Sequence, residues 1–96
     1  MTCDSTHRIS IDNSFPLVTI NQAQFNCLKT ISSGGCATRA LIDMIFDRES
    51  FINKNYTQMA RQFPDEMSAI RNFVLREYKI NVSKFIKSVT AKCHGY

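Results

Sequence analysis

Hydrophobic residues recur at helical spacing along most of the chain, and this spacing predicts five helices. The predicted helices cover residues 21–31, 37–46, 48–53, 65–78 and 82–93. Ahead of them, residues 9–12 and 17–20 alternate loosely between apolar and polar side chains around a turn-like segment, which is typical of a short hairpin or of two extended arms. The pattern therefore predicts an all-α fold, a compact five-helix domain with a short extended segment or hairpin at the N-terminus.

Local sequence signals indicate where these helices begin. Thr19 and Gln22 have the spacing of a capping box at the start of the first helix. Pro64 suits the beginning of the fourth helix, and Asn81 or Ser83 can cap the last one. The polar stretch at residues 53–58 is predicted to be a loop.

The length of 96 residues fits a single small domain, and the chain contains neither an internal repeat nor a Gly/Ser-rich linker. Hydrophobic residues make up 44% of the chain, enough to build a core for a domain of this size. We expect a flexible N-terminal segment at residues 1–14, a helical domain at residues 15–93 and a C-terminal tail at residues 94–96.

The predicted last helix has two chemically different sides on a helical wheel. Its apolar side carries Val82, Phe85, Ile86, Val89 and Cys93, which are expected to face the core. The opposite side carries Lys84, Lys87, Ser88, Ala91 and Lys92, with no acidic residue among them. A solvated helix face more often pairs lysine with glutamate four residues away. The pattern therefore favours a surface that binds phosphate groups, with a solvated lysine face as the alternative.

The net charge of +4 is concentrated in the last quarter of the chain. Residues 1–70 hold six basic and seven acidic side chains, whereas residues 71–96 hold six basic side chains and Glu77 alone, a net charge of +5. Positive charge gathered on one element is typical of a protein that binds a polyanion. This distribution strengthens the phosphate-binding interpretation of the last helix.

Motifs of the common enzyme classes are absent from the sequence. It contains no GxSxG, HExxH, GxxxxGKS/T or GxGxxG pattern, so we expect no enzymatic activity and no cofactor. There is no CxxC pattern and both histidines lie near the chain ends, so we expect no metal site. The four cysteines are interpreted as reduced thiols of an intracellular protein. No apolar stretch is long enough to span a membrane, so no membrane partner is expected.

Several segments together resemble the BEN domain. Residues 15–20, the following helix with Phe25 and Leu28, and residues 40–47 are similar to the first half of that family, in which an extended segment and a helix precede a small-residue turn and a Leu- and Phe-bearing helix. Residues 69–78 resemble the family's Ile-x-x-Tyr/Phe-Val-x-x-x-Phe helix. Residues 82–93, which end in Ala-Lys-Cys, resemble its terminal Ile-x-x-Lys-Cys helix.

BEN domains are helical modules of chromatin, transcription and poxviral proteins, so the resemblance implies binding to double-stranded DNA through the last helix and its flanking loops. The candidate DNA-binding residues are Ser83, Lys84, Lys87, Ser88, Ala91, Lys92 and His94, completed by Lys79, Lys54 and Arg61 on adjoining segments. The loop near Lys54 departs from the family's Ser/Thr-Gly pattern, because Gln58 follows Thr57. Lysine at the exposed positions of the last helix suits phosphate better than bidentate guanine readout.

The abundance of Ile, Asn and Lys is typical of an AT-rich genome and fits a poxviral BEN protein, so the expected location is the nucleus or a cytoplasmic viral DNA factory. The alternative function is a protein-interaction or homodimerisation adaptor. It would use an apolar surface around Phe15, Tyr56 or Phe63. A third interpretation joins the last two helices into a helix-turn-helix through residues 79–81, which lack the usual glycine.

Overall fold

The computed structural model describes residues 8–94 of the chain. In this part, two strands and six helices follow one another as β1 (Arg8–Ser10), β2 (Thr19–Asn21), α1 (Gln22–Lys29), α2 (Gly34–Ile45), α3 (Arg48–Phe51), α4 (Tyr56–Gln62), α5 (Pro64–Tyr78) and α6 (Val82–His94). β1 and β2 form an antiparallel hairpin in which Ile9 is paired with Ile20. The predominantly helical fold with a small N-terminal hairpin is therefore confirmed.

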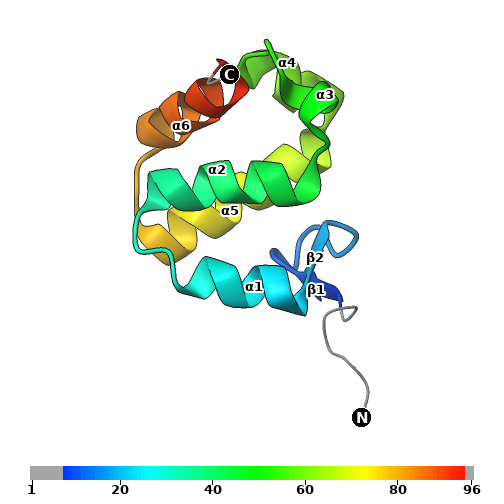
Figure 1. Ribbon diagram of the computed structural model, residues 1–96, viewed down its shortest axis with the longest axis vertical. Helices are drawn as coiled ribbons and strands as arrows, with labels where there is room; N and C mark the ends of the chain where they lie inside the picture. The colour runs from blue at the N-terminus through cyan, green and yellow to red at the C-terminus, as the bar shows by residue number, and fades with distance from the viewer. Residues whose placement is uncertain (1–7, 95–96) are drawn as a thin grey trace.

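α2 lies at the centre of the fold and makes its most extensive contacts with α6 and α5. In Figure 1, α5 passes behind α2, α6 lies on one side of this pair, and α1 lies with the hairpin on the other. The core between them is built from fully buried side chains that include Ile20, Leu28, Leu41, Ile42, Ile70 and Phe85. At the end of α6, the backbone N–H of Asn53 donates to the carbonyl of Cys93 at 2.9 Å, which fixes that end beside α3.

The packed part of the chain begins earlier than residue 15. Ile11 and Asp12 are buried, and Asp12 accepts a hydrogen bond from the side-chain amide of Asn72 on α5 at 2.8 Å. Arg76 donates to the carbonyl of Ile11 at 3.2 Å, so α5 holds the hairpin at two points. Residues 8–14 therefore belong to the domain. The remainder of the predicted N-terminal segment (residues 1–7) and residues 95–96 of the predicted tail lie outside the described residues.

The additional helix, α4, begins inside the stretch that was predicted to be a loop and includes its residues 56–58. The Asn55 side chain accepts the backbone N–H of Gln58 at 2.9 Å, and the Gln58 side chain accepts the backbone N–H of Asn55 at the same distance. This reciprocal capping box has Asn in place of Ser or Thr, and the helix is too short to show a periodic stripe. The same residue types, Asn21 and Gln24, cap α1 two residues later than predicted.

The connection from α5 to α6 is a tight turn with one residue in the left-handed region. Lys79 has φ 53° and ψ 36° and closes α5, a position at which glycine is the usual residue. Asn81 then accepts the backbone N–H of Lys84 at 2.8 Å, as expected for the cap of α6. This turn places Lys79 next to the first turn of α6.

Candidate nucleic-acid interface

α6 packs one side into the core and presents the other to solvent. Phe85, Val89 and Cys93 are fully buried, as the helical wheel predicts, and Ile86 is half-buried. Val82, expected on the same side, is 44% exposed in the first turn of the helix, so its assignment to the core was wrong. The exposed residues that face away from the core are Ser83, Lys84, Lys87, Ala91 and His94, and together they form the α6 face. With 13 residues at 1.5 Å each, the helix is about 20 Å long. Five of the seven α6 residues proposed as DNA-binding therefore share one exposed surface.

Ser88 does not belong to this surface, because it is buried against α2. Its exposed fraction is 7%, and its hydroxyl donates to the carbonyl of Lys84 at 3.0 Å. A Cβ at Gly35, in the first turn of α2, would lie only 3.1 Å from the Ser88 Oγ. The close approach of two helices at a glycine thus covers a small polar side chain, and the prediction that Ser88 is exposed was wrong.

Lys92 is also turned toward the protein. Its Nζ lies 2.7 Å from the Asp43 Oδ2 on α2, and only 16% of its side chain is exposed. The same Nζ lies 5.8 Å from the centre of the Phe51 ring. Because a lysine can lay its methylene stem over apolar groups while its ammonium reaches a carboxylate, a charged residue need not point outward. Placing Lys92 on the open face was wrong, and the residue instead fastens α6 to α2.

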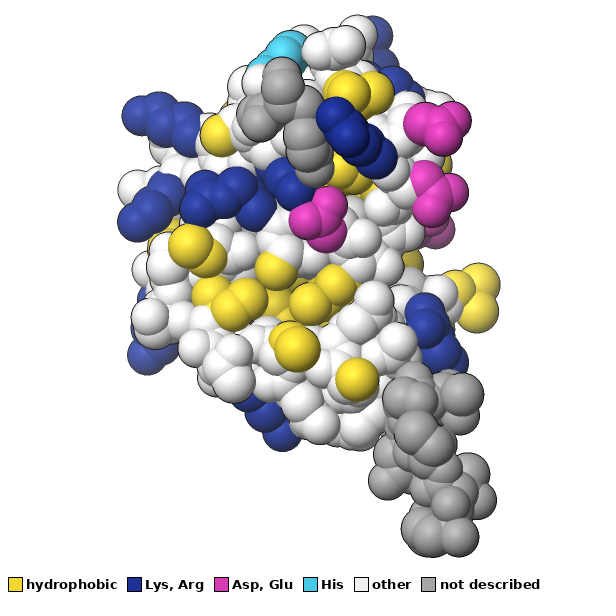
Figure 2. Space-filling view, viewed as in Figure 1, with side chains coloured by type: hydrophobic (Ala, Val, Ile, Leu, Met, Phe, Trp, Pro, Cys, Tyr) yellow, Lys and Arg dark blue, Asp and Glu magenta, His cyan; other side chains and the backbone are white. Residues whose placement is uncertain are grey.

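A half-buried basic residue that the sequence interpretation missed, Arg39, lies where α2 and α6 cross. A Cβ at Gly35, which would lie 3.1 Å from the Ser88 Oγ, would also lie 3.8 Å from the Arg39 Nη1. Its Nη2 donates to the Cys36 Sγ at 3.3 Å. Figure 2 shows basic side chains gathered where α6 and the start of α2 lie side by side. Arg39, Lys84 and Lys87 are called the basic face below.

The other basic candidates lie around this face at different places. Lys79 is exposed at the turn before α6. Lys54 lies near the far end of α6, where its side chain donates to Gln62 and its Nζ is 5.9 Å from the Phe63 ring centre. Burial raises the pKa of the Cys93 thiol, and the nearby charges of Lys54 and Lys92 partly oppose this rise. Arg61 is exposed on α4, and no contact in the described residues joins it to the α6 face.

The residues proposed for a protein-interaction surface are largely engaged in packing. The Tyr56 ring meets the Phe85 ring edge-on at 5.7 Å, and the Phe63 ring lies 4.8 Å from the Phe46 ring. Phe15 is partly buried against the core. Among the described residues, the exposed large apolar side chains are Leu17, 95% accessible in the loop between β1 and β2, and Val82, 44% accessible at the start of α6.

Within the described residues, no three His, Cys, Asp or Glu side chains are grouped closely enough to hold a metal ion. No helix there has the length and apolar character needed to cross a membrane. Among the described residues, Cys27, Cys36 and Cys93 are free thiols; Cys27 and Cys36 are exposed, and Cys93 is buried.

No protein-family model, no curated protein and no solved structure matches this chain. The resemblance to the BEN domain consequently stays a prediction from sequence. A functional proposal has to rest on the charge, exposure and packing of the described side chains.

Proposed function

We propose that this chain is a BEN-like module that binds double-stranded DNA with its basic face and with Lys79. The observation that carries this proposal is the arrangement of Lys84 and Lys87, two exposed lysines on one side of a helix that contains no acidic residue. Arg39 extends the same surface from the neighbouring helix.

The dimensions of α6 support contact with a duplex. A helix with its side chains is about 10–12 Å across, which matches the width of the major groove of about 12 Å. Ser83 and Ala91 are small, so the α6 face can approach a partner closely between its lysines. Lysine is a compact charge without the planar fork of arginine, so Lys84 and Lys87 are suited to phosphate contacts rather than to base readout.

The packing of the acidic side chains also favours an anionic partner. Asp43 of α2 is paired with Lys92, and Glu77 of α5 lies 3.0 Å from the Arg76 Nε. These two carboxylates therefore have cationic partners other than the exposed lysines. These two acidic groups therefore reduce the positive potential of the basic face less than the small net charge of the whole chain implies.

A matched pair of charge reversals tests the proposal. Lys87→Glu changes the α6 face, whereas Lys29→Glu makes the same change of net charge on α1. In fluorescence anisotropy with a random-sequence duplex at about 50 mM salt, loss of one phosphate contact weakens binding about tenfold. We expect at least this loss for Lys87→Glu, no detectable binding for Lys84→Glu combined with Lys87→Glu, and wild-type affinity for Lys29→Glu. Equal affinities for the Lys87→Glu and Lys29→Glu proteins would refute the proposal.

The exposed Leu17 supports the alternative, an adaptor that binds another protein or a second copy of the chain. Size-exclusion chromatography with and without duplex DNA separates the two functions. A DNA-binding module moves to an earlier elution volume only when the duplex is added. An adaptor that dimerises elutes early without DNA and returns to the monomer volume in a Leu17→Ser variant.

A further inference from the structure

A pocket of about 440 Å³ lies between α1, β1 and α5. Its volume falls within the range of about 300–1,000 Å³ that is usual for small-molecule sites. None of the residues that line it belongs to the basic face or to α6. The pocket is therefore a feature that the proposed DNA binding does not use.

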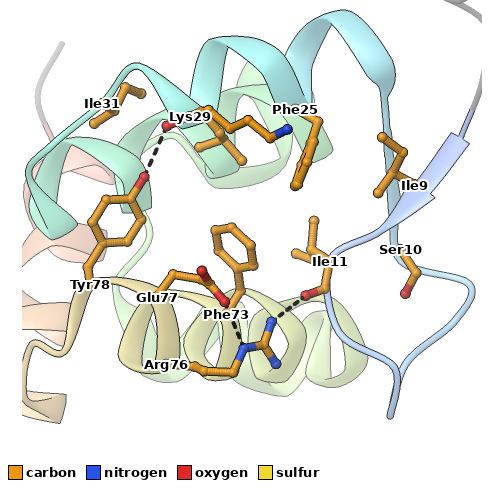
Figure 3. A pocket seen from close by; sticks show the side chains of 11 residues that line it. Ile9, Ser10, Ile11, Phe25, Lys29, Ile31, Phe73, Arg76, Glu77 and Tyr78 are labelled. Carbon is orange, nitrogen blue, oxygen red and sulfur yellow. Dashed lines mark hydrogen bonds and ion pairs between the residues drawn. The ribbon is translucent and has the colours of Figure 1, made fainter.

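The walls of the pocket are apolar and aromatic. Figure 3 shows the Phe25 ring of α1 and the Phe73 ring of α5 pointing toward each other from opposite sides, with Ile9 and Ile11 of the hairpin segment closing one end. Phe25 and Ile9 are only partly buried. Apolar surface that faces a water-filled hollow gains free energy when an apolar ligand covers it.

The polar groups at the rim differ in how fully they are engaged. The Arg76 guanidinium donates to the Glu77 carboxylate at 3.0 Å and to the Ile11 carbonyl at 3.2 Å. The Tyr78 hydroxyl donates to the Leu28 carbonyl at 3.0 Å. In the described part of the chain, Lys29 has no carboxylate within ion-pair distance, and its Nζ lies 4.8 Å from the centre of the Phe25 ring. The rim therefore carries one unbalanced positive charge, placed directly above an aromatic wall.

We propose that this pocket binds a small aromatic monoanion, such as an aromatic carboxylate, with its ring between Phe25 and Phe73 and its anionic group at Lys29. The two rings provide an apolar slot, and Lys29 provides the complementary charge. Glu77 disfavours a second negative charge on the side of Arg76. Since the basic face and the pocket share no residue, either binding activity can fail without the other.

Two probes of matched shape test the charge requirement. In ¹H–¹⁵N NMR titrations of the full chain, we expect naphthoate to cause saturable shifts confined to the backbone of the hairpin, α1 and the end of α5. Neutral naphthamide should cause the same shifts with affinity about two- to fivefold lower, because it lacks the charge that Lys29 attracts. Shifts that are not saturable, or that spread over other elements, would overturn the proposal.

Variants complete the experiment. Lys29→Glu should lower naphthoate affinity to or below that of naphthamide, whereas Lys87→Glu, with the same change of net charge, should leave it unchanged. Ile31→Trp should fill the pocket and abolish binding of both probes, with circular dichroism confirming that the fold is retained. If the Ile31→Trp protein does not fold, the Lys29→Glu and Lys87→Glu comparison still decides. Equal naphthoate affinity in the wild-type and Lys29→Glu proteins would refute the role of Lys29 and with it the proposal.

Discussion

Replacing Lys92 with alanine separates the structural lysine of α6 from the exposed ones. Lys92 is 16% exposed, holds Asp43 at 2.7 Å and lies over Phe51, whereas Lys87 points into solvent. Although the two residues are five positions apart on the same helix, their removal should affect different properties. Lys92→Ala should destabilise the fold, and Lys87→Ala should weaken DNA binding.

The size of the Lys92 effect follows from its contacts. The ion pair contributes about 0.5–1 kcal/mol, because 56% of the Asp43 side chain is exposed and solvent screens the attraction. Covering of apolar surface by the lysine stem adds about 1–2 kcal/mol, and the ammonium over the ring adds about 0.5 kcal/mol. Lysine loses side-chain entropy on folding and alanine does not, which offsets about 1–2 kcal/mol of this stabilisation. We therefore expect Lys92→Ala to lower the free energy of unfolding by about 1 kcal/mol.

Thermal unfolding followed by circular dichroism measures this loss, which corresponds to a decrease in Tm of about 4–8 °C for a domain of this size. The Lys87→Ala control should change the free energy of unfolding by less than about 0.5 kcal/mol. A double-mutant cycle with Asp43→Ala should return a coupling energy of about 0.5–1 kcal/mol. The reasoning is refuted if Lys92→Ala leaves Tm unchanged and weakens DNA binding as strongly as Lys87→Ala does.

Three further predictions concern the packing and ionisation of other positions. Gly34→Ala should lower the free energy of unfolding, measured with urea, by about 1–3 kcal/mol, because the new Cβ would lie 2.7 Å from the Ile80 Cγ2. Gly35→Ala should cost less, because the atom nearest to its new Cβ is the Ser88 Oγ at 3.1 Å. Asn55→Ala should cost about 1 kcal/mol and mainly reduce amide-exchange protection in α4, since it removes the reciprocal cap with Gln58; unchanged protection would contradict the role of this cap. Burial raises the pKa of the Cys93 thiol, so its contribution to the free energy of unfolding should be constant below about pH 8.5 and fall as the pH rises above that value. Urea titrations between about pH 7 and pH 10 should show a smaller fall for Cys93→Ala, and identical pH profiles would contradict this assignment.

Most of the helices can be predicted from the sequence because their apolar residues recur at helical spacing over several turns. α2, α5 and α6 each span at least three turns, and their buried residues recur at helical spacing. α4 has only seven residues and buries Met59, so it shows no apolar stripe, although Asn55 and Gln58 have the spacing of a capping box. The hairpin is predicted only as one of two options, because its strands pair over three residues each and depend on α5 to hold them.

The candidate site is predicted less completely, because a helical wheel does not show which other helices pack against the one it draws. It assigns Ser88 and Lys92 to the outside by their polarity, whereas the position of α2 decides that one is buried and the other paired. Arg39 lies outside the basic last quarter of the sequence, so a tally of charge along the chain does not associate it with α6. Only the close packing of Gly35 against Ser88 brings Arg39, one turn later on α2, to the basic face.

The salt dependence of DNA affinity tests the central proposal most directly. If Arg39, Lys79, Lys84 and Lys87 each neutralise one phosphate, a plot of log K against log salt concentration should have a slope of about −3.6. Removing two of these charges, with Lys84→Gln and Lys87→Gln together, should reduce the slope to about −1.8 while the fold is retained. A wild-type slope near zero, or the same slope in the double variant, would contradict phosphate binding by α6.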